Sequence, residues 1–270
     1  MFMSIYRGVA LTVAGSDSGG GAGIQADLKT FAALRGFGTT VVTALTAQNS
    51  IGVSAIHGIP EEMIRAQAEA VCGDFRPGAA KTGMLATRRT ILEVAGSIGG
   101  KCPFLVVDPV MVATSGDSLL EPDAEETLAR VLVPLATLVT PNVPEAEKLA
   151  GTRVRDVDGM IAAAERISRM GARGVLVKGG HLEGPVMRDI LLWEGRLRVF
   201  EEPRIPTRNT HGTGCTLSAA ITAELAAGSP MEKAVERARA YLRAALASNF
   251  SGGRGRGCLG HAVSVPWIQP

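Results

Sequence analysis

The sequence has no pair of cysteines at metal-binding spacing, no long apolar run and almost no net charge. Its four cysteines lie far apart, without a C-x-x-C pair, so we expect neither a zinc site nor a dense disulfide framework. No stretch approaches about 18 uninterrupted apolar residues, which argues against a membrane span. The 28 basic residues nearly cancel the 26 acidic ones, so charge gives no reason to expect nucleic acid or a membrane as a partner.

The amino terminus also lacks the pattern of a signal peptide, in which a basic start precedes about 7–15 apolar residues. Together with the scattered cysteines, this predicts a reduced, soluble, cytoplasmic protein. With 46% apolar residues the chain is not disordered, and 270 residues bury enough surface to fold without metals or disulfides. We expect one domain over residues 1–270, with roughly the last 15 residues as an irregular tail.

Short apolar, β-branched segments alternate with longer segments of helical periodicity. This alternation predicts βαβ units, and therefore an α/β fold in which helices cover both faces of a central, mainly parallel sheet. The expected strands cover residues 9–14, 39–45, 79–82, 105–107, 138–140 and 174–178, followed by a hairpin over 189–200. The expected helices cover residues 25–34, 61–71, 90–95, 160–170, 215–227 and 231–249.

Glycines and polar residues gather directly after the predicted strands. Ligands bind outside the carboxyl ends of the strands in such a sheet, so these segments are the expected binding site. In chain order they are Gly15–Gly23, Thr46–Asn49, Gly83 with Met84, Asp108, Asn142–Glu145, Gly179–His181 and the loop before Cys215.

The first glycine-rich segment, Gly15–Gly23, follows a predicted strand and opens a helix. It is not a P-loop, and its match to a dinucleotide pattern lacks the expected acidic residue, since none lies between positions 28 and 60. Two interpretations remain: a loop where a small ligand meets the backbone beside Asp17 and Asp27, or a tight strand-to-helix turn. The later match Gly255–Gly260 follows a helix too near the end for a βαβ unit, so we attribute it to chance.

The segment Thr210–Cys215 contains Gly-Thr-Gly and leads directly into an apolar, alanine-rich helix. Glycines before a helix expose unpaired N–H groups, and the helix dipole adds positive charge there. This predicts a site for a phosphate, or for the charge that develops in phosphoryl transfer. Cys215 lies in the first turn, where we expect a thiol pKa below its free value of about 8.5. The alternative is a glycine-rich helix start with a structural cysteine.

Seven motifs that together span nearly the whole chain resemble the hydroxymethylpyrimidine/phosphomethylpyrimidine kinases of thiamine biosynthesis, a branch of the ribokinase-like superfamily. They are Gly20–Thr30, Thr43–Asn49, Lys81–Leu85, Asp108–Met111, Thr140–Glu145, Lys178–His181 and Asn209–Thr216. The resemblance implies a three-layer ribokinase-like fold without a large separate lid domain, usually as a homodimer. It also implies ATP-dependent phosphorylation of 4-amino-5-hydroxymethyl-2-methylpyrimidine to its monophosphate, and then to the diphosphate.

The resemblance implies a role for each matching residue. The substrate-binding residues would be Gly15, Asp27, Thr46, Gln48 and Met84. The catalytic residues would be Lys178, Gly212, Thr213, Gly214 and Cys215, the last at a position where most of the superfamily has an aspartate as general base. ATP would be bound by Asp108, Asn142, Lys178 and Thr210, and Mg²⁺ would be organised through water by Asn142 and Glu145.

The chemistry of these side chains agrees with the implied roles. A side-chain amide such as Gln48 complements the adjacent donor and acceptor of an aminopyrimidine. Glu145 supplies the hard oxygen that Mg²⁺ prefers, and Lys178 offers a compact charge for phosphate. Two other functions stay open. One is a pyridoxal kinase, which shares the fold and the cysteine, and the other is a non-catalytic pyrimidine-binding module, for which the phosphate-binding residues would be superfluous.

Overall fold

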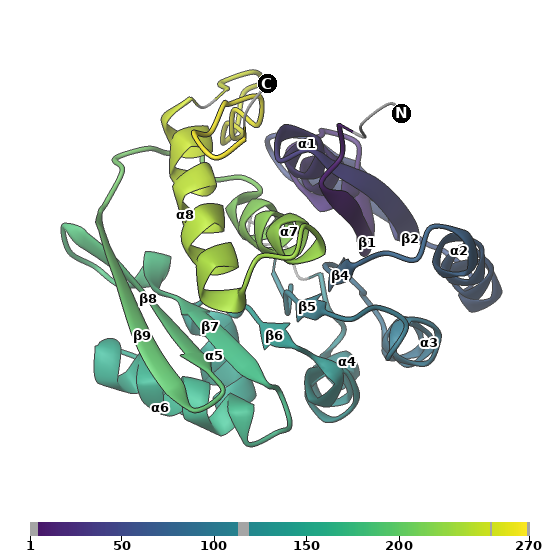
Figure 1. The fold of residues 1–270 in the computed structure, drawn as a ribbon, viewed down its shortest axis with the longest axis horizontal. Helices are drawn as coiled ribbons and strands as arrows, with labels where there is room; N and C mark the ends of the chain where they lie inside the picture. The colour runs from purple at the N-terminus through teal and green to yellow at the C-terminus, as the bar shows by residue number, and fades with distance from the viewer. Residues whose placement is uncertain (1–4, 113–118, 249, 269–270) are drawn as a thin grey trace.

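The computed structural model describes residues 5–112, 119–248 and 250–268. Within them, nine strands form one sheet in the order β3-β2-β1-β4-β5-β6-β7-β8-β9 (Figure 1). The six strands from β2 to β7 in this order pair in parallel, whereas β3, β8 and β9 pair antiparallel. The bounds are β1 (Gly8–Asp17), β2 (Gly36–Gln48), β3 (Val53–Gly58), β4 (Ala79–Thr82), β5 (Leu105–Val107), β6 (Leu138–Val139), β7 (Gly174–Lys178), β8 (Val186–Trp193) and β9 (Arg196–Pro203).

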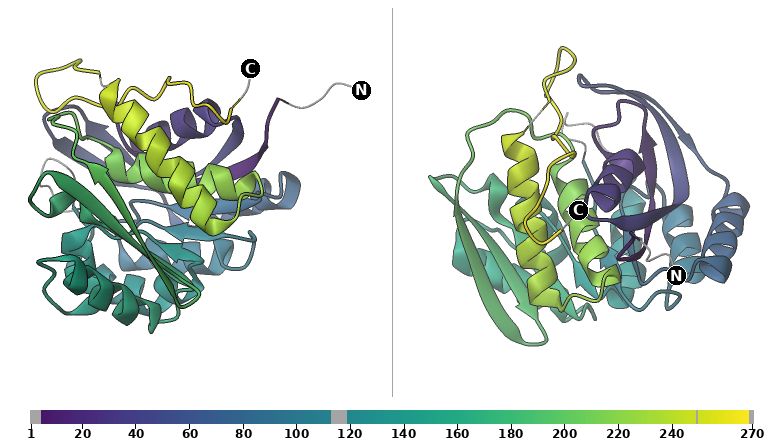
Figure 2. Two further views of the ribbon diagram at one scale, coloured as in Figure 1. Left: turned by 60° about the vertical axis from the view of Figure 1, so that its left-hand side comes forward. Right: turned by 45° about the horizontal axis from the view of Figure 1, so that its top comes forward.

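Helices cover both faces of this sheet, so the predicted three-layer α/β fold is confirmed. Figures 1 and 2 show α1 (Gly23–Ala33), α7 (Thr213–Ala226) and α8 (Met231–Ala247) on one face. The other face carries α2 (Glu61–Asp74), α3 (Arg88–Ile98), α4 (Pro122–Thr127), α5 (Val143–Ala150) and α6 (Val157–Ser168). Short irregular turns occupy Leu128–Leu132, Val133–Leu135 and Gly179–His181. The predicted end of the last helix, Asn249, lies outside the described residues.

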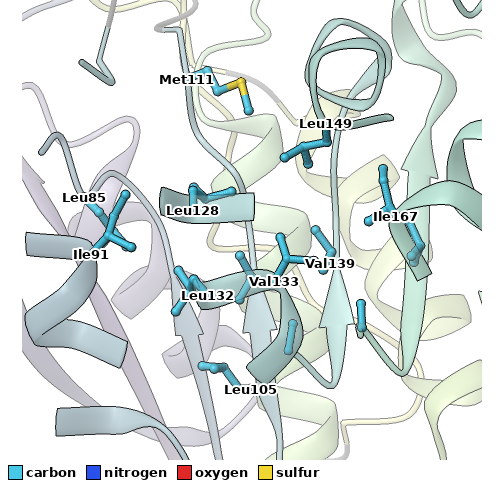
Figure 3. Close-up of a cluster of buried hydrophobic side chains, with 14 of the residues drawn as sticks. Leu85, Ile91, Leu105, Met111, Leu128, Leu132, Val133, Val139, Leu149 and Ile167 are labelled. Carbon is cyan, nitrogen blue, oxygen red and sulfur yellow. The ribbon is translucent and has the colours of Figure 1, made fainter. Parts of the chain in front are cut away.

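Successive residues of the parallel strands pack into two separate hydrophobic clusters. In β5, Leu105 and Val107 join the cluster under α2–α6, whereas Val106 joins the cluster under α1, α7 and α8. Figure 3 shows Leu105 at the lower edge of the first of these clusters, below Leu132 of the segment after α4, with Ile91 of α3 farther away beside Leu85. Because both faces are covered, these strands need apolar residues at every position, which explains the unbroken apolar runs of the sequence.

Three elements were not predicted from the sequence. Strand β3 lies at the edge of the sheet and is mostly exposed, so it lacks the apolar alternation of a half-buried strand. Helix α4 covers only six residues, too few to show a helical period. Helix α5 begins inside the Asn142–Glu145 motif. The Asn142 side chain accepts the Glu145 N–H at 2.9 Å, and the Glu145 carboxylate accepts the Asn142 N–H at 2.8 Å, which forms a capping box.

The connections of the strands place a crevice at one edge of the sheet. Strand β1 pairs with β2 on one side and with β4 on the other, and the parallel strands that follow β4 continue in that direction. The strand order therefore reverses beside β1, and crevices open at such positions outside the carboxyl ends of the strands. No helix within the described ranges is long and apolar enough to cross a bilayer.

A buried carboxylate holds the amino-terminal segment, α7 and α8 together. Glu224 of α7 accepts hydrogen bonds from Arg7 at 2.8 Å, from Arg237 at 3.0 Å and from the Trp267 indole at 3.0 Å. The Glu224 side chain is fully buried, and burial by itself raises the pKa of a carboxyl group because it favours the neutral form. The hydrogen bonds from Arg7, Ser229 and Arg237 outweigh this burial and lower the pKa of Glu224 to about 2.

We expect Glu224→Gln to lower the free energy of unfolding by about 3 kcal/mol at neutral pH, measured by urea denaturation. The folded-state pKa is depressed from 4.5, so the carboxylate stabilises the fold fully above pH 4.5 and loses this contribution as pH falls toward 2. The difference between the wild type and the variant should therefore narrow below pH 4.5. The control Glu201→Gln, in an exposed ion pair with Arg188, should change stability by less than about 1 kcal/mol. A difference for Glu224→Gln that does not change with pH would contradict this account.

Candidate active site

A cavity of about 590 Å³ opens at the carboxyl ends of the parallel strands. Its wall includes residues from the ends of β1, β2, β5 and β7, from the segment after β4, from the start of α5 and from the start of α7. It brings together all the residues predicted for the site except Asp27. These are Gly15, Thr46, Gln48, Met84, Asp108, Asn142, Glu145, Lys178, Thr210, Gly212, Thr213, Gly214 and Cys215.

Asp27 lies beneath the cavity and does not line it. It belongs to the inner face of α1 and is fully buried, where it pairs with Lys81 at 3.1 Å and accepts the Thr12 hydroxyl at 2.6 Å. The expectation that Asp27 forms part of the substrate pocket therefore does not agree with this structure, because helical periodicity turns its side chain inward. Burial lowers the pKa of the Lys81 ammonium, but attraction to Asp27 and Cys215 outweighs burial and raises it.

Cys215 lies above this buried pair, in the first turn of α7. Burial raises the pKa of its thiol to about 11, although Lys81 and the Gly23 N–H act in the opposite direction. The expectation of a pKa below the free value is therefore wrong, because desolvation of the sulfur outweighs the helix start. At neutral pH, Cys215 is a neutral thiol in the ligand-free protein.

The start of α7 presents unpaired backbone donors to the cavity. The N–H groups of Gly214 and Cys215 have no acceptor among the residues that the structure describes; we call these two groups the anion site. Gly212, which caps the helix, has φ +84°, and a Cβ there would lie 1.9 Å from the carbonyl oxygen of Gly21. Only glycine permits both this conformation and this contact, so α7 begins directly against the first glycine loop.

An ion pair faces the anion site from β5 and β7. The Lys178 ammonium lies 2.9 Å from Asp108, whose other carboxylate oxygen accepts the Ser218 hydroxyl at 3.2 Å. A Cβ on Gly214 would be 3.4 Å from Lys178 Nζ, so the ammonium sits beside the start of α7. Burial lowers the pKa of Lys178, but Asp108 and Glu145 raise it by more, which keeps the charge in place. Unpaired N–H groups and an ammonium together suit a phosphate.

Glu145 adds a second carboxylate near this ion pair. Burial raises its pKa to about 7, against the lowering effect of Lys178. The Glu145 side chain supplies the hard oxygen that suits Mg²⁺. Within the described ranges no cluster of three or more His, Cys, Asp or Glu residues could hold a metal. The residues therefore fit a Mg²⁺ ion that takes most of its ligands from water and phosphate, as Mg²⁺ usually does.

Asp17 organises the first glycine loop and is not free to accept from a ligand. Its carboxylate accepts the N–H groups of Gly19, Gly21 and Ala22 at 2.8–3.0 Å, and it contacts His211 Nε2 at 3.1 Å. Burial acts to raise the pKa of Asp17, but these hydrogen bonds lower it below its usual value. The position of the aspartate two residues before a run of three glycines, Gly19–Gly21, is a signal that could have predicted this role.

The opposite end of the cavity, near β1, β2 and β4, is less charged. The single proton of the Thr46 hydroxyl can be donated to Gln48 Oε1 at 3.0 Å, which orients the amide, or to the Ser16 carbonyl oxygen at 2.9 Å. No hydrogen bond within the described ranges uses the Gln48 NH₂ group. Met84 lies beside Gly15, where a Cβ would come within 3.3 Å of its sulfur. The cavity therefore combines an apolar end that carries one oriented amide with an end that suits phosphate.

Comparison with known proteins identifies the family. The family model described as phosphomethylpyrimidine kinase matches residues 17–260. The hydroxymethylpyrimidine/phosphomethylpyrimidine kinase of Rhizobium meliloti is 51% identical over 256 residues, which cover 94% of this chain and 96% of that protein. The chain belongs to the phosphomethylpyrimidine kinase family. The resemblance seen in the sequence is thereby confirmed, as is the enzyme class, a kinase.

Two further matches bear on the length of this chain and on its fold. A thiamine biosynthesis bifunctional protein of Geobacter sulfurreducens is 49% identical over 264 residues, but the chain spans only 54% of its length. The crystal structure of an ADP complex of Bacillus subtilis pyridoxal kinase superposes with a TM-score of 0.88 at 39% identity, and covers 94% of this chain and 97% of that one. This phosphomethylpyrimidine kinase family member therefore has the ribokinase-like fold that its sequence predicted.

We expect Cys215→Ala to lower kcat by about 10²–10⁴-fold, the usual contribution of a general base. Steady-state kinetics with saturating ATP measures the effect. Because burial raises the thiol pKa to about 11, the thiolate fraction grows about tenfold per pH unit in the neutral range. A base role therefore predicts that kcat of the wild type rises with pH and that this rise disappears in the variant.

If Cys215→Ala lowers kcat by less than about threefold and leaves the pH profile of kcat unchanged, Cys215 only lines the cavity. Cys72→Ala provides the control, because that cysteine packs against the hydrophobic cluster under α2–α6 and does not line the cavity. It should leave kcat and its pH profile unchanged.

Proposed function

We propose that the chain transfers a phosphoryl group from ATP to the hydroxymethyl group of 4-amino-5-hydroxymethyl-2-methylpyrimidine, and then to the phosphate of the resulting monophosphate. These two reactions serve thiamine diphosphate biosynthesis. The observation that carries the proposal is the meeting, in one cavity, of the anion site of α7, the Lys178–Asp108 pair and the oriented amide of Gln48. The match to the family supports the same substrates.

The apolar end of the cavity receives the pyrimidine. When Thr46 donates its proton to Gln48 Oε1 rather than to the Ser16 carbonyl oxygen, the Gln48 NH₂ group is directed at a ring nitrogen of the pyrimidine. The flat ring lies beside Met84 and the bare backbone of Gly15, where a side chain would take up its space. This arrangement leaves the hydroxymethyl group to face the start of α7.

The other end holds the phosphates of ATP. The bond from the γ-phosphorus to its bridging oxygen breaks, ADP leaves with that oxygen, and a new bond forms to the substrate oxygen. In the first transfer the alcohol releases its proton to Cys215, which accepts it only in the fraction of the protein whose thiol is already deprotonated. Such transition states are loose, so positioning and charge stabilisation dominate. The N–H groups of Gly214 and Cys215 and the Lys178 ammonium stabilise the charge on the transferred group. Asp108 holds the ammonium there, at 2.9 Å.

Mg²⁺ accompanies ATP in this proposal and neutralises part of the phosphate charge. Glu145 and Asn142 would organise it through water, with Asp108 nearby, because these residues supply oxygen atoms beside the phosphate end of the cavity. The capping box fixes the Glu145 carboxylate against the Asn142 backbone, so its position does not depend on the ligand. The pyridoxal kinase of the same fold was crystallised as an ADP complex, which supports nucleotide binding by this chain.

A homodimer is part of this proposal. The β2–β3 region exposes three large apolar side chains, Leu45, Ile51 and Ile56, each between 46% and 58% exposed. Strand β3 also forms one edge of the sheet, a position where a further strand can pair. A second copy of the chain would cover both features.

Pyridoxal phosphorylation is the second candidate, since the pyridoxal kinase structure described above has the same fold at 39% identity. The two functions differ in the ring that the cavity accepts. An aminopyrimidine offers the adjacent donor and acceptor that a side-chain amide complements, which favours the pyrimidine. The phosphate end of the cavity serves either substrate.

The experiment compares ATP-dependent phosphorylation of the hydroxymethylpyrimidine, its monophosphate and pyridoxine under identical conditions. We expect transfer to the first two, with kcat/KM for pyridoxine lower by about tenfold or more, since a mismatched buried amide costs about 1–3 kcal/mol. Lys178→Met should abolish all transfer and so excludes a contaminating kinase. Transfer to pyridoxine alone would contradict the proposal.

A further inference from the structure

A glycine-rich segment near the carboxyl terminus, residues 250–258, forms a closed loop that reaches the cavity at Arg256; we call it the strap. Its ends are joined by two backbone hydrogen bonds, from Phe250 N to Cys258 O at 2.8 Å and from Cys258 N to Phe250 O at 2.9 Å. Figure 2 shows this segment, in yellow, extending beyond the end of α8. No role in the proposed function has been assigned to the strap.

One side of the strap is fastened next to the substrate end of the cavity. The Arg256 N–H donates to the Ser50 carbonyl oxygen at 3.1 Å, and the Gly255 N–H donates to the Ser50 hydroxyl at 3.0 Å. A Cβ on Gly255 would lie 1.8 Å from the Ser50 carbonyl oxygen, so the strap can lie this close only with glycine there. Ser50 follows Gln48 by two residues, which places the Arg256 backbone beside the end of β2.

The other side of the strap is fastened next to the start of α7. The Gly257 N–H donates to Asn209 Oδ1 at 3.1 Å, and the His211 N–H donates to the Gly257 carbonyl oxygen at 3.4 Å. A Cβ on Gly257 would lie 2.5 Å from the Asn209 side chain. Arg256 is therefore held between two glycines, with the residues around Gln48 on one side and the approach to Gly212 on the other.

The guanidinium of Arg256 differs from the other Lys and Arg groups in the cavity wall. Each of the others is committed to protein oxygens: Lys148 to Glu125, Lys178 to Asp108, Arg204 to three carbonyl oxygens, Arg239 to Asp189, and Arg243 to Glu202 and Pro203. Arg256 also lines the cavity, but its guanidinium has no hydrogen bond or ion pair to any residue that the structure describes. Its donors are therefore available to a ligand.

We propose that Arg256 binds the phosphate of the monophosphate substrate and so determines specificity for the second phosphoryl transfer. The first substrate is a neutral alcohol, whereas its product is a phosphate monoester with nearly two negative charges. That phosphate must lie between the pyrimidine, at Gln48, and the anion site of α7, and Arg256 is anchored between these two places. A guanidinium offers two parallel donors that match a phosphate. This inference rests on the proposed function.

The test compares Arg256→Gln with Arg254→Gln, a matched control on the same strap that does not line the cavity. For each protein, kcat/KM is measured for the alcohol and for the monophosphate with saturating ATP. We expect Arg256→Gln to lower the ratio of kcat/KM for the monophosphate to kcat/KM for the alcohol by about tenfold. This is the lower end of the range for a hydrogen bond to a charged group, which we expect because Arg256 is exposed. Arg254→Gln should keep the wild-type ratio.

Binding without ATP gives a readout independent of turnover. Calorimetry should show that Arg256→Gln weakens binding of the monophosphate about tenfold relative to the alcohol, and that Arg256→Lys restores part of the loss. An unchanged ratio, or an equal effect of Arg254→Gln, would overturn the inference. The inference would also be overturned if Arg256→Gln raised the KM for ATP with both substrates, because Arg256 would then contact the nucleotide. A wild-type protein that binds the monophosphate but phosphorylates neither substrate would contradict the proposed function and leave the binding comparison as the test of Arg256.

Discussion

The contact between the start of α7 and the first glycine loop is the constraint on which the site depends. Gly212 lies so close to the Gly21 carbonyl oxygen that a Cβ would come within 1.9 Å, and its φ of +84° turns the chain into the helix at that point. This contact directs the free N–H groups of Gly214 and Cys215 into the cavity. Asp17 supports the contact from the other side, since it holds three N–H groups of the glycine loop and contacts His211. The excess of glycine in the chain is thus partly explained by close backbone approaches at the site.

Buried charges are arranged in pairs around this contact. Lys178 and Asp108 form one pair in the cavity wall, and Lys81 and Asp27 form another beneath it. Within each pair, the attraction between opposite charges offsets part of the cost of burial, which would be higher for an isolated charge. Each pair is neutral overall, so attraction for a phosphate depends on the position of the Lys178 ammonium and on the free N–H groups at the start of α7. Cys215 lies between the two pairs, but burial keeps its thiol neutral at neutral pH, so a base role belongs only to the small fraction of the protein in which the thiol has already lost its proton.

The fold class and most of the site could be predicted from the sequence, because apolar strands and the polar residues that follow them are local patterns. Burial depends on the whole fold, and here prediction failed. Asp27 lies in a recognisable motif, yet its place on the inner face of α1 buries it away from the cavity. The helix start suggested an acidic thiol at Cys215, but the depth of the sulfur raises its pKa. Arg256 carried no signal, because only the folded strap brings it to Ser50 and Asn209.

The central claim is that the free N–H groups at the start of α7 hold the phosphate that is transferred. Amide NMR of protein labelled at glycine and cysteine, titrated with a non-hydrolysable ATP analogue and Mg²⁺, tests this claim most directly. The account predicts that the Gly214 and Cys215 amide protons move downfield and exchange more slowly with solvent at saturation, because each gains a phosphate oxygen as acceptor. The account would be contradicted if these two signals stayed in place while that of Gly180, elsewhere in the cavity wall, shifted.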